Sequence, residues 1–129
     1  MQPELTAPHR IAPLRFRIQV KHDVAIGPGK ADILSLIAET GSMAETGRRM
    51  GMSYQRIWTL VNAMNEHFNE PLVTKQRGGG SSGGAALTPA GLEVLRLYRL
   101  VEAEAEQAIA PHLKQLHSLM KAEVKDTAT

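Results

Sequence analysis

Two short helical segments with clear capping residues are the feature that most constrains the fold of this sequence. Ser42, with Glu45 three residues later, is a capping box, which predicts a helix over Met43–Met50. Ser53 is a second N-cap and predicts a helix over roughly 54–68. The short turn between them contains a glycine, and two helices joined by such a turn of about three residues form a helix-turn-helix unit.

The residues before this unit predict a small β element and one further helix. Apolar and polar residues alternate along Leu14–Ile26, which predicts a half-buried strand or a short hairpin. Apolar residues recur at a helical period over Lys30–Thr40, and Gly41 is a typical C-terminal glycine for that helix. We expect about the first 12 residues to be disordered.

The stretch Gly78–Gly84 consists of five glycines and two serines, and it fits a flexible linker, a phosphate-binding loop or part of a binding surface. GGGSSG matches the pattern G-x-G-x-x-G, but a dinucleotide site needs a helix directly after the glycines, and here the next helix begins at Pro89. Ala85 and Ala86 stand where a Walker loop has its lysine and its hydroxyl residue. A linker would separate two domains, whereas one capped helix follows. Composition alone does not exclude an engineered insertion.

The remaining interpretation is a β-hairpin with the glycines at its tip. Pro71–Thr74 and Ala85–Thr88 predict short strands on either side of the glycine run. A hairpin directly after a helix-turn-helix is the wing of a winged helix, in which the second helix enters the major groove and the wing lies along the phosphates or the neighbouring minor groove. Glycines let backbone N–H groups approach phosphates, and Lys75 and Arg77 add positive charge.

The rest of the chain predicts one long helix. Thr88 and Pro89 supply an N-cap and a proline at the first helical position. An interior proline removes a hydrogen bond, so we expect a kink or a break at Pro111. The apolar stripe of this helix is longer than the rest of the domain can cover, so we expect it to pack on a second copy of the chain. The expected dimerisation residues are Leu92, Leu95, Tyr98, Val101, Ala105 and Ile109.

These elements define the expected architecture. The fold class is mainly α with a small β-wing, a winged helix-turn-helix with a long C-terminal dimerisation helix. Residues 1–88 are expected to form the DNA-binding domain, with the wing at about 72–88, and residues 89–124 the dimerisation helix. The wing tip, Gly78–Gly84, is expected to have the least fixed structure in the free protein.

Composition excludes several other functions. The sequence has no cysteine, which excludes disulfides and thiolate chemistry and favours a reducing, cytoplasmic setting. Its five histidines do not cluster at metal-ligand spacing, so we expect no metal site. No window approaches the roughly 18 apolar residues of a membrane span, and we expect no membrane partner. Nothing in the sequence positions a substrate beside its acids, serines or histidines, so we expect no enzymatic activity.

Positive charge is concentrated in one part of the sequence, although the net charge is only +2. Residues 48–77 contain five basic residues and two acids, whereas the residues from Glu93 onward contain five basic residues and six acids. This distribution is typical of a face that binds a polyanion, and it is equally compatible with a solvated surface patch.

The chain resembles a known family over roughly Leu14 to Glu106. The resemblance is carried by GSMAETGRRMGMSYQRIWTLVNAMNEHF, by PLVTKQRGGGSSGGAALTPAGLEVLRLYRLVEAE and by the strand-first start. These segments resemble the N-terminal DNA-binding domain of the ModE-type molybdenum-responsive regulators, which are related to the winged helices of LysR-type regulators. The most specific pieces are Ser53-Tyr54, Trp58, NAMN at 62–65 and LTPAG at 87–91.

The resemblance implies a homodimer held by helices, a winged helix on double-stranded DNA, and transcriptional control of molybdate uptake or molybdenum enzymes. Full-length members of the family carry a C-terminal pair of small β-barrel domains that bind molybdate or tungstate, and this sequence ends at Thr129 soon after its long helix. We therefore expect a stand-alone DNA-binding module with no molybdate site and no cofactor. The alternative is a dimeric protein-interaction module, or a co-regulator of a full-length ModE-type relative, with weak affinity for DNA.

The expected DNA-binding residues follow from their places on the recognition helix and the wing. Those at the N-terminal end or outward face of the recognition helix, within reach of base edges, are Ser53, Tyr54, Gln55, Thr59 and Asn62. Those expected at phosphates are Arg48, Arg49, Arg56, Lys75 and Arg77. Asn62, followed by Gln55, is the strongest candidate, because amide side chains can read adenine with two hydrogen bonds.

Some of these residues also have a purely structural interpretation. Tyr54 shares a face with Val61 and fits core packing as well as DNA contact, and for Trp58 we favour the core. Arg48 and Arg49 are equally compatible with a solvated surface. The methionines expected in the core are Met43, Met50, Met52 and Met64.

Overall fold

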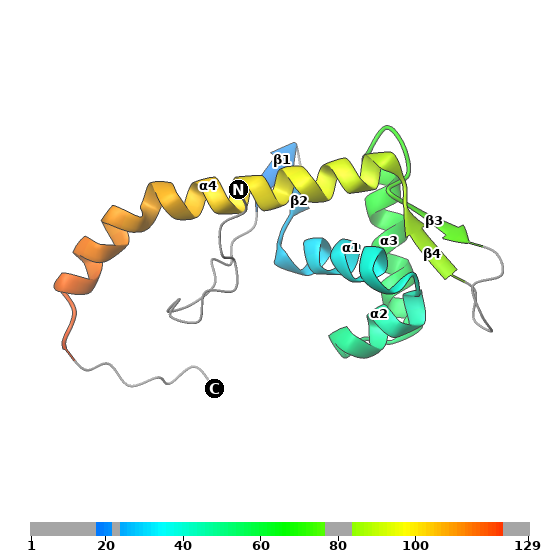
Figure 1. The fold of residues 1–129 in the computed structure, drawn as a ribbon, viewed down its shortest axis with the longest axis horizontal. Helices are drawn as coiled ribbons and strands as arrows, with labels where there is room; N and C mark the ends of the chain where they lie inside the picture. The colour runs from blue at the N-terminus through cyan, green and yellow to red at the C-terminus, as the bar shows by residue number, and fades with distance from the viewer. Residues whose placement is uncertain (1–17, 22–23, 77–83, 123–129) are drawn as a thin grey trace.

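The computed structural model describes residues 18–21, 24–76 and 84–122. Figure 1 shows a small body of helices and hairpins from which one long helix extends far to one side. The expectations for the first 12 residues, for Arg77 and for most of the glycine run lie outside the described residues.

The described part of the chain begins with a hairpin. β1 (Ile18–Lys21) pairs antiparallel with β2 (Val24–Ile26), which is one of the two arrangements that the alternating pattern predicts. α1 (Pro28–Thr40) follows and begins slightly before the expected Lys30, because the first helical position tolerates a proline that lacks its N–H. Gly41 ends α1, as predicted.

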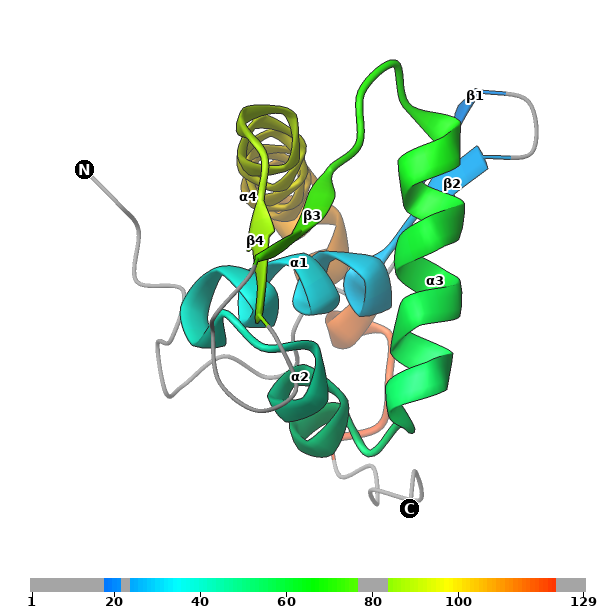
Figure 2. The same ribbon diagram turned by 90° about the vertical axis from the view of Figure 1, so that its right-hand side faces the viewer.

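The predicted helix-turn-helix consists of α2 (Met43–Met50) and α3 (Tyr54–His67). The turn between them contains Gly51, whose φ of 70° lies in the left-handed region that favours glycine. α1 contacts α2, and α2 contacts α3, so the three helices form one body with α3 upright along one side (Figure 2).

Both helices have the predicted N-cap, but the capping box of α2 is only half formed. The Ser42 hydroxyl accepts a hydrogen bond from the Glu45 N–H (3.0 Å), and the Ser53 hydroxyl accepts one from the Arg56 N–H (3.0 Å). A full capping box would also join the Ser42 N–H to the Glu45 carboxylate. That N–H donates to Thr40 Oγ1 instead (3.1 Å), so the prediction of a complete box is wrong and the Glu45 carboxylate is left for other partners.

The wing is an antiparallel hairpin of β3 (Val73–Gln76) and β4 (Gly84–Leu87). Both strands lie slightly nearer the glycine run than predicted, because the pairing continues toward the tip as far as Gln76 and Gly84. The Ala85 N–H donates to the Gly41 carbonyl (3.0 Å), so β4 is also joined to the end of α1. The wing is therefore attached to the helical body along one strand.

The core lies between the three helices and the start of the wing. Its buried side chains, none more than 2% exposed, are Ile33, Leu34, Ile37, Met43, Ile57, Val61, Met64, Leu72, Val73 and Ala85. Met50 and Met52 pack half-buried against this cluster. The prediction that all four methionines serve the core is confirmed.

The long helix predicted after the wing is α4 (Pro89–Ser118). The Thr88 hydroxyl accepts a hydrogen bond from the Gly91 N–H (3.0 Å), which confirms the predicted N-cap. Of the kink or break expected at Pro111, the break does not occur, because α4 continues through this residue. The ribbon bends over its C-terminal part (Figure 1). A helix absorbs one interior proline by bending, since only one hydrogen bond is lost. α4 ends before the expected residue 124.

The N-terminal half of α4 is fixed to α1. Arg99 Nη2 pairs with Asp32 Oδ1 of α1 at 3.3 Å. Tyr98 is 3% exposed because it packs on Ala31 of α1, so this member of the expected dimerisation stripe lies inside the chain's own core. Burial, followed by the charge of Glu102, raises the pKa of the Tyr98 hydroxyl.

The start of α4 approaches the start of β3 too closely for a side chain. A Cβ on Gly91 would lie 2.2 Å from the Leu72 carbonyl oxygen, which is backbone and has little freedom to move. Gly29, near the start of α1, provides a contrast because a Cβ there meets nothing within 4 Å. Both glycines follow closely on a proline at the first helical position.

We therefore expect Gly91→Ala to lower the free energy of unfolding by roughly 1–3 kcal/mol, because the methyl group must displace backbone. Gly29→Ala should leave it unchanged or raise it by up to about 1 kcal/mol, since alanine is the better helix former. Urea denaturation followed by circular dichroism measures both. Equal effects of the two substitutions would contradict the close approach of Gly91 to Leu72.

Candidate nucleic-acid interface

The outward face of α3 presents polar side chains at helical spacing. Gln55, Thr59 and Asn62 are exposed and stand at i, i+4 and i+7. On the opposite face Ile57 and Val61 are completely buried. Because the buried face fixes the rotation of α3, the three polar side chains point away from the body.

The polar side chains at this face differ in how far the protein already uses them. The Thr59 hydroxyl donates to the Gln55 carbonyl (3.0 Å), and the Ser53 hydroxyl is held in the cap of α3. Within the described residues, the amides of Gln55 and Asn62 make no hydrogen bond to the protein. Each amide offers both a donor and an acceptor, so these two side chains keep their full capacity for an external partner.

Two aromatic side chains of α3, Tyr54 and Trp58, lie beside a lysine of the wing. Lys75 Nζ lies 5.0 Å from the centroid of the Trp58 ring, within the range of a cation–π interaction. The Tyr54 ring meets Trp58 edge-on, with centroids 6.4 Å apart. Trp58 is half-buried against the core, as we favoured, whereas Tyr54 is 44% exposed. The wing and the recognition helix therefore meet at Trp58.

Asn65 is a second link between α3 and the wing, and sequence reasoning assigned it no role. Its Oδ1 accepts from the Leu72 N–H (2.8 Å) and the Val73 N–H (3.2 Å), and its Nδ2 donates to the Val73 carbonyl (3.1 Å). The available signal was its position four residues after Val61, on the apolar side of α3. A polar residue on a buried face usually has a specific hydrogen-bonding partner.

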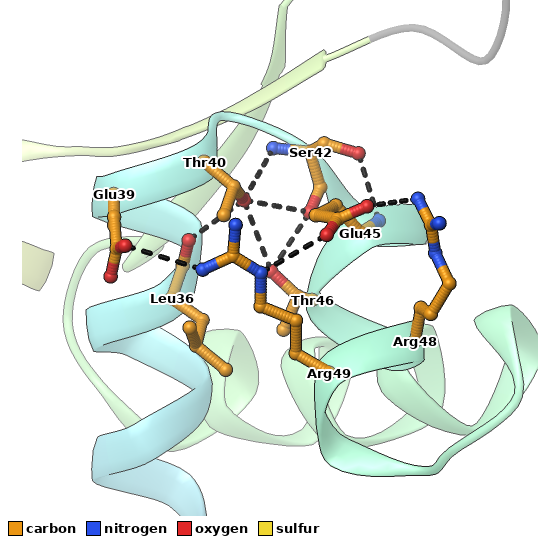
Figure 3. Close-up of polar contacts among 8 residues, drawn as sticks. All are labelled: Leu36, Glu39, Thr40, Ser42, Glu45, Thr46, Arg48 and Arg49. Atoms are coloured by element: carbon orange, nitrogen blue, oxygen red, sulfur yellow. Dashed lines mark hydrogen bonds and ion pairs between the residues drawn. The ribbon is translucent and has the colours of Figure 1, made fainter.

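The arginines of α2 are not free cations, because both pair with one carboxylate (Figure 3). Arg49 Nε donates to Glu45 Oε2 at 3.0 Å and Arg49 Nη1 to Glu39 Oε2 at 3.2 Å, while Arg48 Nη2 pairs with Glu45 Oε1. The bond to Glu45, followed by that to Glu39, raises the pKa of Arg49. Glu45 stands three and four residues before the arginines, which is the sequence signal for such pairs.

The other expected phosphate contacts have no such restraint in the described residues. Arg56, at the N-terminal end of α3, and Lys75, on the wing, are exposed. Neither has an acidic partner among the residues that the structure describes. Arg77 lies outside them. Positive charge free of internal acids thus lies at the start of α3 and at the base of the wing.

The expected dimerisation stripe of α4 does not form one uniform face. Leu92 and Val101 are 53% and 42% exposed, whereas Leu95, Ala105 and Ile109 are half-buried and Tyr98 is buried. A spacing of three drifts around a helix of 3.6 residues per turn, so the series turns from solvent at Leu92 to the side that faces α1 at Tyr98 and outward again at Val101. Further exposed apolar side chains of α4 are Leu97, Leu100, Leu113 and Leu116.

The described ranges show neither a metal-binding cluster nor a membrane-spanning helix. These residues contain no group of three or more histidine, cysteine or acidic side chains that could hold a metal ion. No helix among them is long and apolar enough to cross a membrane.

The role of Asn65 yields a prediction with a matched control on the same helix. Asn65→Ala removes three hydrogen bonds and leaves part-buried N–H groups of the wing unpaired, so we expect it to lower the free energy of unfolding by about 1–3 kcal/mol. Asn62→Ala, on the exposed face, should change it by less than about 0.5 kcal/mol. Chemical denaturation of both variants checks this difference. An Asn65→Ala protein as stable as Asn62→Ala would contradict the assigned link.

Comparison with known proteins places this geometry in a family. Residues 30–92, which hold the helix-turn-helix and the wing, match the family described as "Bacterial regulatory helix-turn-helix protein, lysR family". The molybdenum-pterin-binding protein MopB of Rhodobacter capsulatus is 37% identical over 71% of this chain and 34% of its own length. The DNA-binding transcriptional dual regulator ModE of Escherichia coli K12 is 30% identical over 70% of this chain and 34% of its own length.

The molybdenum transport protein ModE of Azotobacter vinelandii is 30% identical over 74% of this chain and 37% of its own length. The chain thus spans about a third of the length of these curated relatives. A crystal structure of the CbnR DNA-binding domain with DNA is 23% identical, with a TM-score of 0.48 over 64% of this chain and 93% of that one. Residues 30–92 therefore belong to the lysR family of bacterial regulatory helix-turn-helix proteins, in a form related in sequence to the ModE and Mop molybdenum proteins.

Proposed function

We propose that the chain is a transcriptional regulator that binds double-stranded DNA with α3 in the major groove and the wing against the phosphate backbone. The observation that carries this proposal is the outward face of α3, where the amides of Gln55 and Asn62 have no protein partner in the described residues. The family match supports it, because residues 30–92 belong to a family of bacterial regulators.

The proposed roles follow from position and chemistry. Asn62 and Gln55 read base edges, since an amide can bond adenine bidentately in the major groove. Arg56 and Lys75 contact phosphates, which give affinity and orientation without sequence information. Ser53 acts through its cap, which fixes the N-terminal end of α3, and Trp58 holds the wing cation beside the helix.

The names of the relatives support a narrower proposal about the regulated genes. The sequence relatives include a molybdenum transport protein ModE and a DNA-binding transcriptional dual regulator ModE. We therefore propose that this chain controls genes for molybdate uptake or for molybdenum enzymes. The proposal concerns the step of DNA binding and assigns no molybdate site to the described residues.

We further propose that the chain acts as a homodimer through α4. This helix extends well beyond the body (Figure 1). Large apolar side chains remain exposed along it. Several large apolar side chains left exposed along one helix are typical of an interaction site. A symmetric dimer would present two recognition helices to two related half-sites on DNA.

Selection of bound sequences from random DNA, with and without molybdate, tests the proposed function. A two-fold-related pair of half-sites, separated by about one helical turn or more, is the expected result. A pool without enrichment would contradict sequence-specific regulation and favour the protein-interaction alternative.

Binding to the selected DNA sequence can separate the proposed base contact of Asn62 from the proposed phosphate contact of Arg56. Asn62→Ala should reduce discrimination between the selected and a scrambled sequence by about 1–3 kcal/mol, because one base contact is lost. Arg56→Ala should weaken both complexes alike and lower the slope of log K against log salt by about one unit. Fluorescence anisotropy titrations at several salt concentrations measure both quantities. Unchanged discrimination in Asn62→Ala would contradict its assignment.

The dimer proposal is tested by placing charge on the exposed side of α4. Leu97 and Val101 stand four residues apart, and both are more than 40% exposed. The double substitution Leu97→Glu with Val101→Glu should convert a dimer to a monomer, because carboxylates are costly to bury in an interface. Gln107→Glu, at an exposed polar position of the same helix, is the control and should remain dimeric. Sedimentation of the unaltered chain as a monomer would contradict the proposal.

A further inference from the structure

Helix α2 and the end of α1 together carry a charge cluster whose net charge is zero. Arg48 and Arg49 share the carboxylate of Glu45, and Arg49 also reaches Glu39 at the end of α1 (Figure 3). The two positive and two negative charges cancel. Arg48 and Arg49, two of the expected phosphate contacts, are therefore already paired with acids of the same chain.

The position of Glu45 follows from the corner between α1 and α2. Thr40 Oγ1 accepts the hydrogen bond from the Ser42 N–H (3.1 Å), so the cap of α2 does not need the Glu45 carboxylate. The Glu45 N–H still donates to the Ser42 hydroxyl, which keeps the residue at the start of α2. The carboxylate turns along the helix instead and meets both arginines one turn later.

These ion pairs are exposed enough to be exchanged. The side chains of Arg48 and Arg49 are 76% and 46% exposed, and exposed pairs stabilise proteins only weakly. A DNA phosphate can therefore replace the carboxylate as the partner of an arginine. The displaced carboxylate stays nearby, however, and repels the same phosphate.

We propose that Glu45, assisted by Glu39, restrains the arginines of α2 and so limits the affinity of this chain for DNA of any sequence. This inference rests on the proposed DNA-binding function. In a helix-turn-helix the first helix crosses the DNA backbone, which places the cluster beside phosphates rather than bases. The restraint lowers the sequence-independent part of binding and leaves the reading of bases to α3. The restraint therefore leaves the ratio of specific to non-specific affinity unchanged.

The test is Glu45→Gln, which keeps the size of the side chain and leaves the backbone cap intact. We expect binding to the selected and the scrambled sequence to tighten by the same factor, about fivefold at low salt, because one or both arginines are released. The slope of log K against log salt should steepen by about 0.9 for each arginine that gains a phosphate. Glu39→Gln, which touches Arg49 alone, should act in the same direction and less strongly.

Glu93→Gln is the matched control, because Glu93 forms an exposed pair with Arg96 three residues later, on α4. Glu93→Gln changes the net charge of the chain by the same amount as Glu45→Gln, but at a position away from α2. If Glu45→Gln binds DNA no more tightly than Glu93→Gln, the proposal is overturned. Thermal unfolding of each variant verifies that the fold is retained.

A second arm separates release of the arginines from simple loss of negative charge. In a chain with Arg48→Gln and Arg49→Gln, adding Glu45→Gln should give a clearly smaller gain, because no arginine remains to be released and only the repulsion between the carboxylate and the phosphates is removed. A gain of the same size would overturn the restraint. Absence of DNA binding by the unaltered chain would instead contradict the proposed function, so the two failures are distinguishable.

Discussion

The arrangement of recognition helix, wing and long helix depends on the backbone of Leu72. Its N–H donates to Asn65 Oδ1 on α3 (2.8 Å), and its carbonyl oxygen accepts from the Thr88 N–H at the start of α4 (2.9 Å). Its side chain is completely buried in the core. The start of α4 lies directly against this peptide, and the same carbonyl therefore leaves no room for a side chain at position 91. One residue thus sets the wing relative to both helices.

The parts of the fold that depend on neighbouring residues were predictable from the sequence. The caps at Ser42, Ser53 and Thr88 each join a hydroxyl to an N–H three residues later, so the starts of α2, α3 and α4 follow from local pattern alone. The exposed stripe of α3 follows equally from its apolar period. The helix-turn-helix and its outward polar side chains therefore follow from the sequence without any tertiary contact.

The parts that depend on distant residues were not predictable in the same way. Asn65 acts through a strand that begins eight residues later, and Tyr98 is covered by α1, which lies far away in the sequence. Glu45 stands three and four residues before Arg48 and Arg49, which is a local signal for ion pairs. It also stands three residues after Ser42, which fits a capping box equally well. Thr40 decides between the two roles, because it takes the hydrogen bond that the box would have used.

The contact between Lys75 and Trp58 has a practical consequence, because Trp58 is the one tryptophan in the sequence. The emission of an indole depends on the charges close to its ring. A displacement of the wing base from α3 would remove a positive charge from one face of the indole, while Tyr54 remains at its edge. The chain therefore contains its own fluorescent reporter of the distance between wing and recognition helix, with no need for an attached dye.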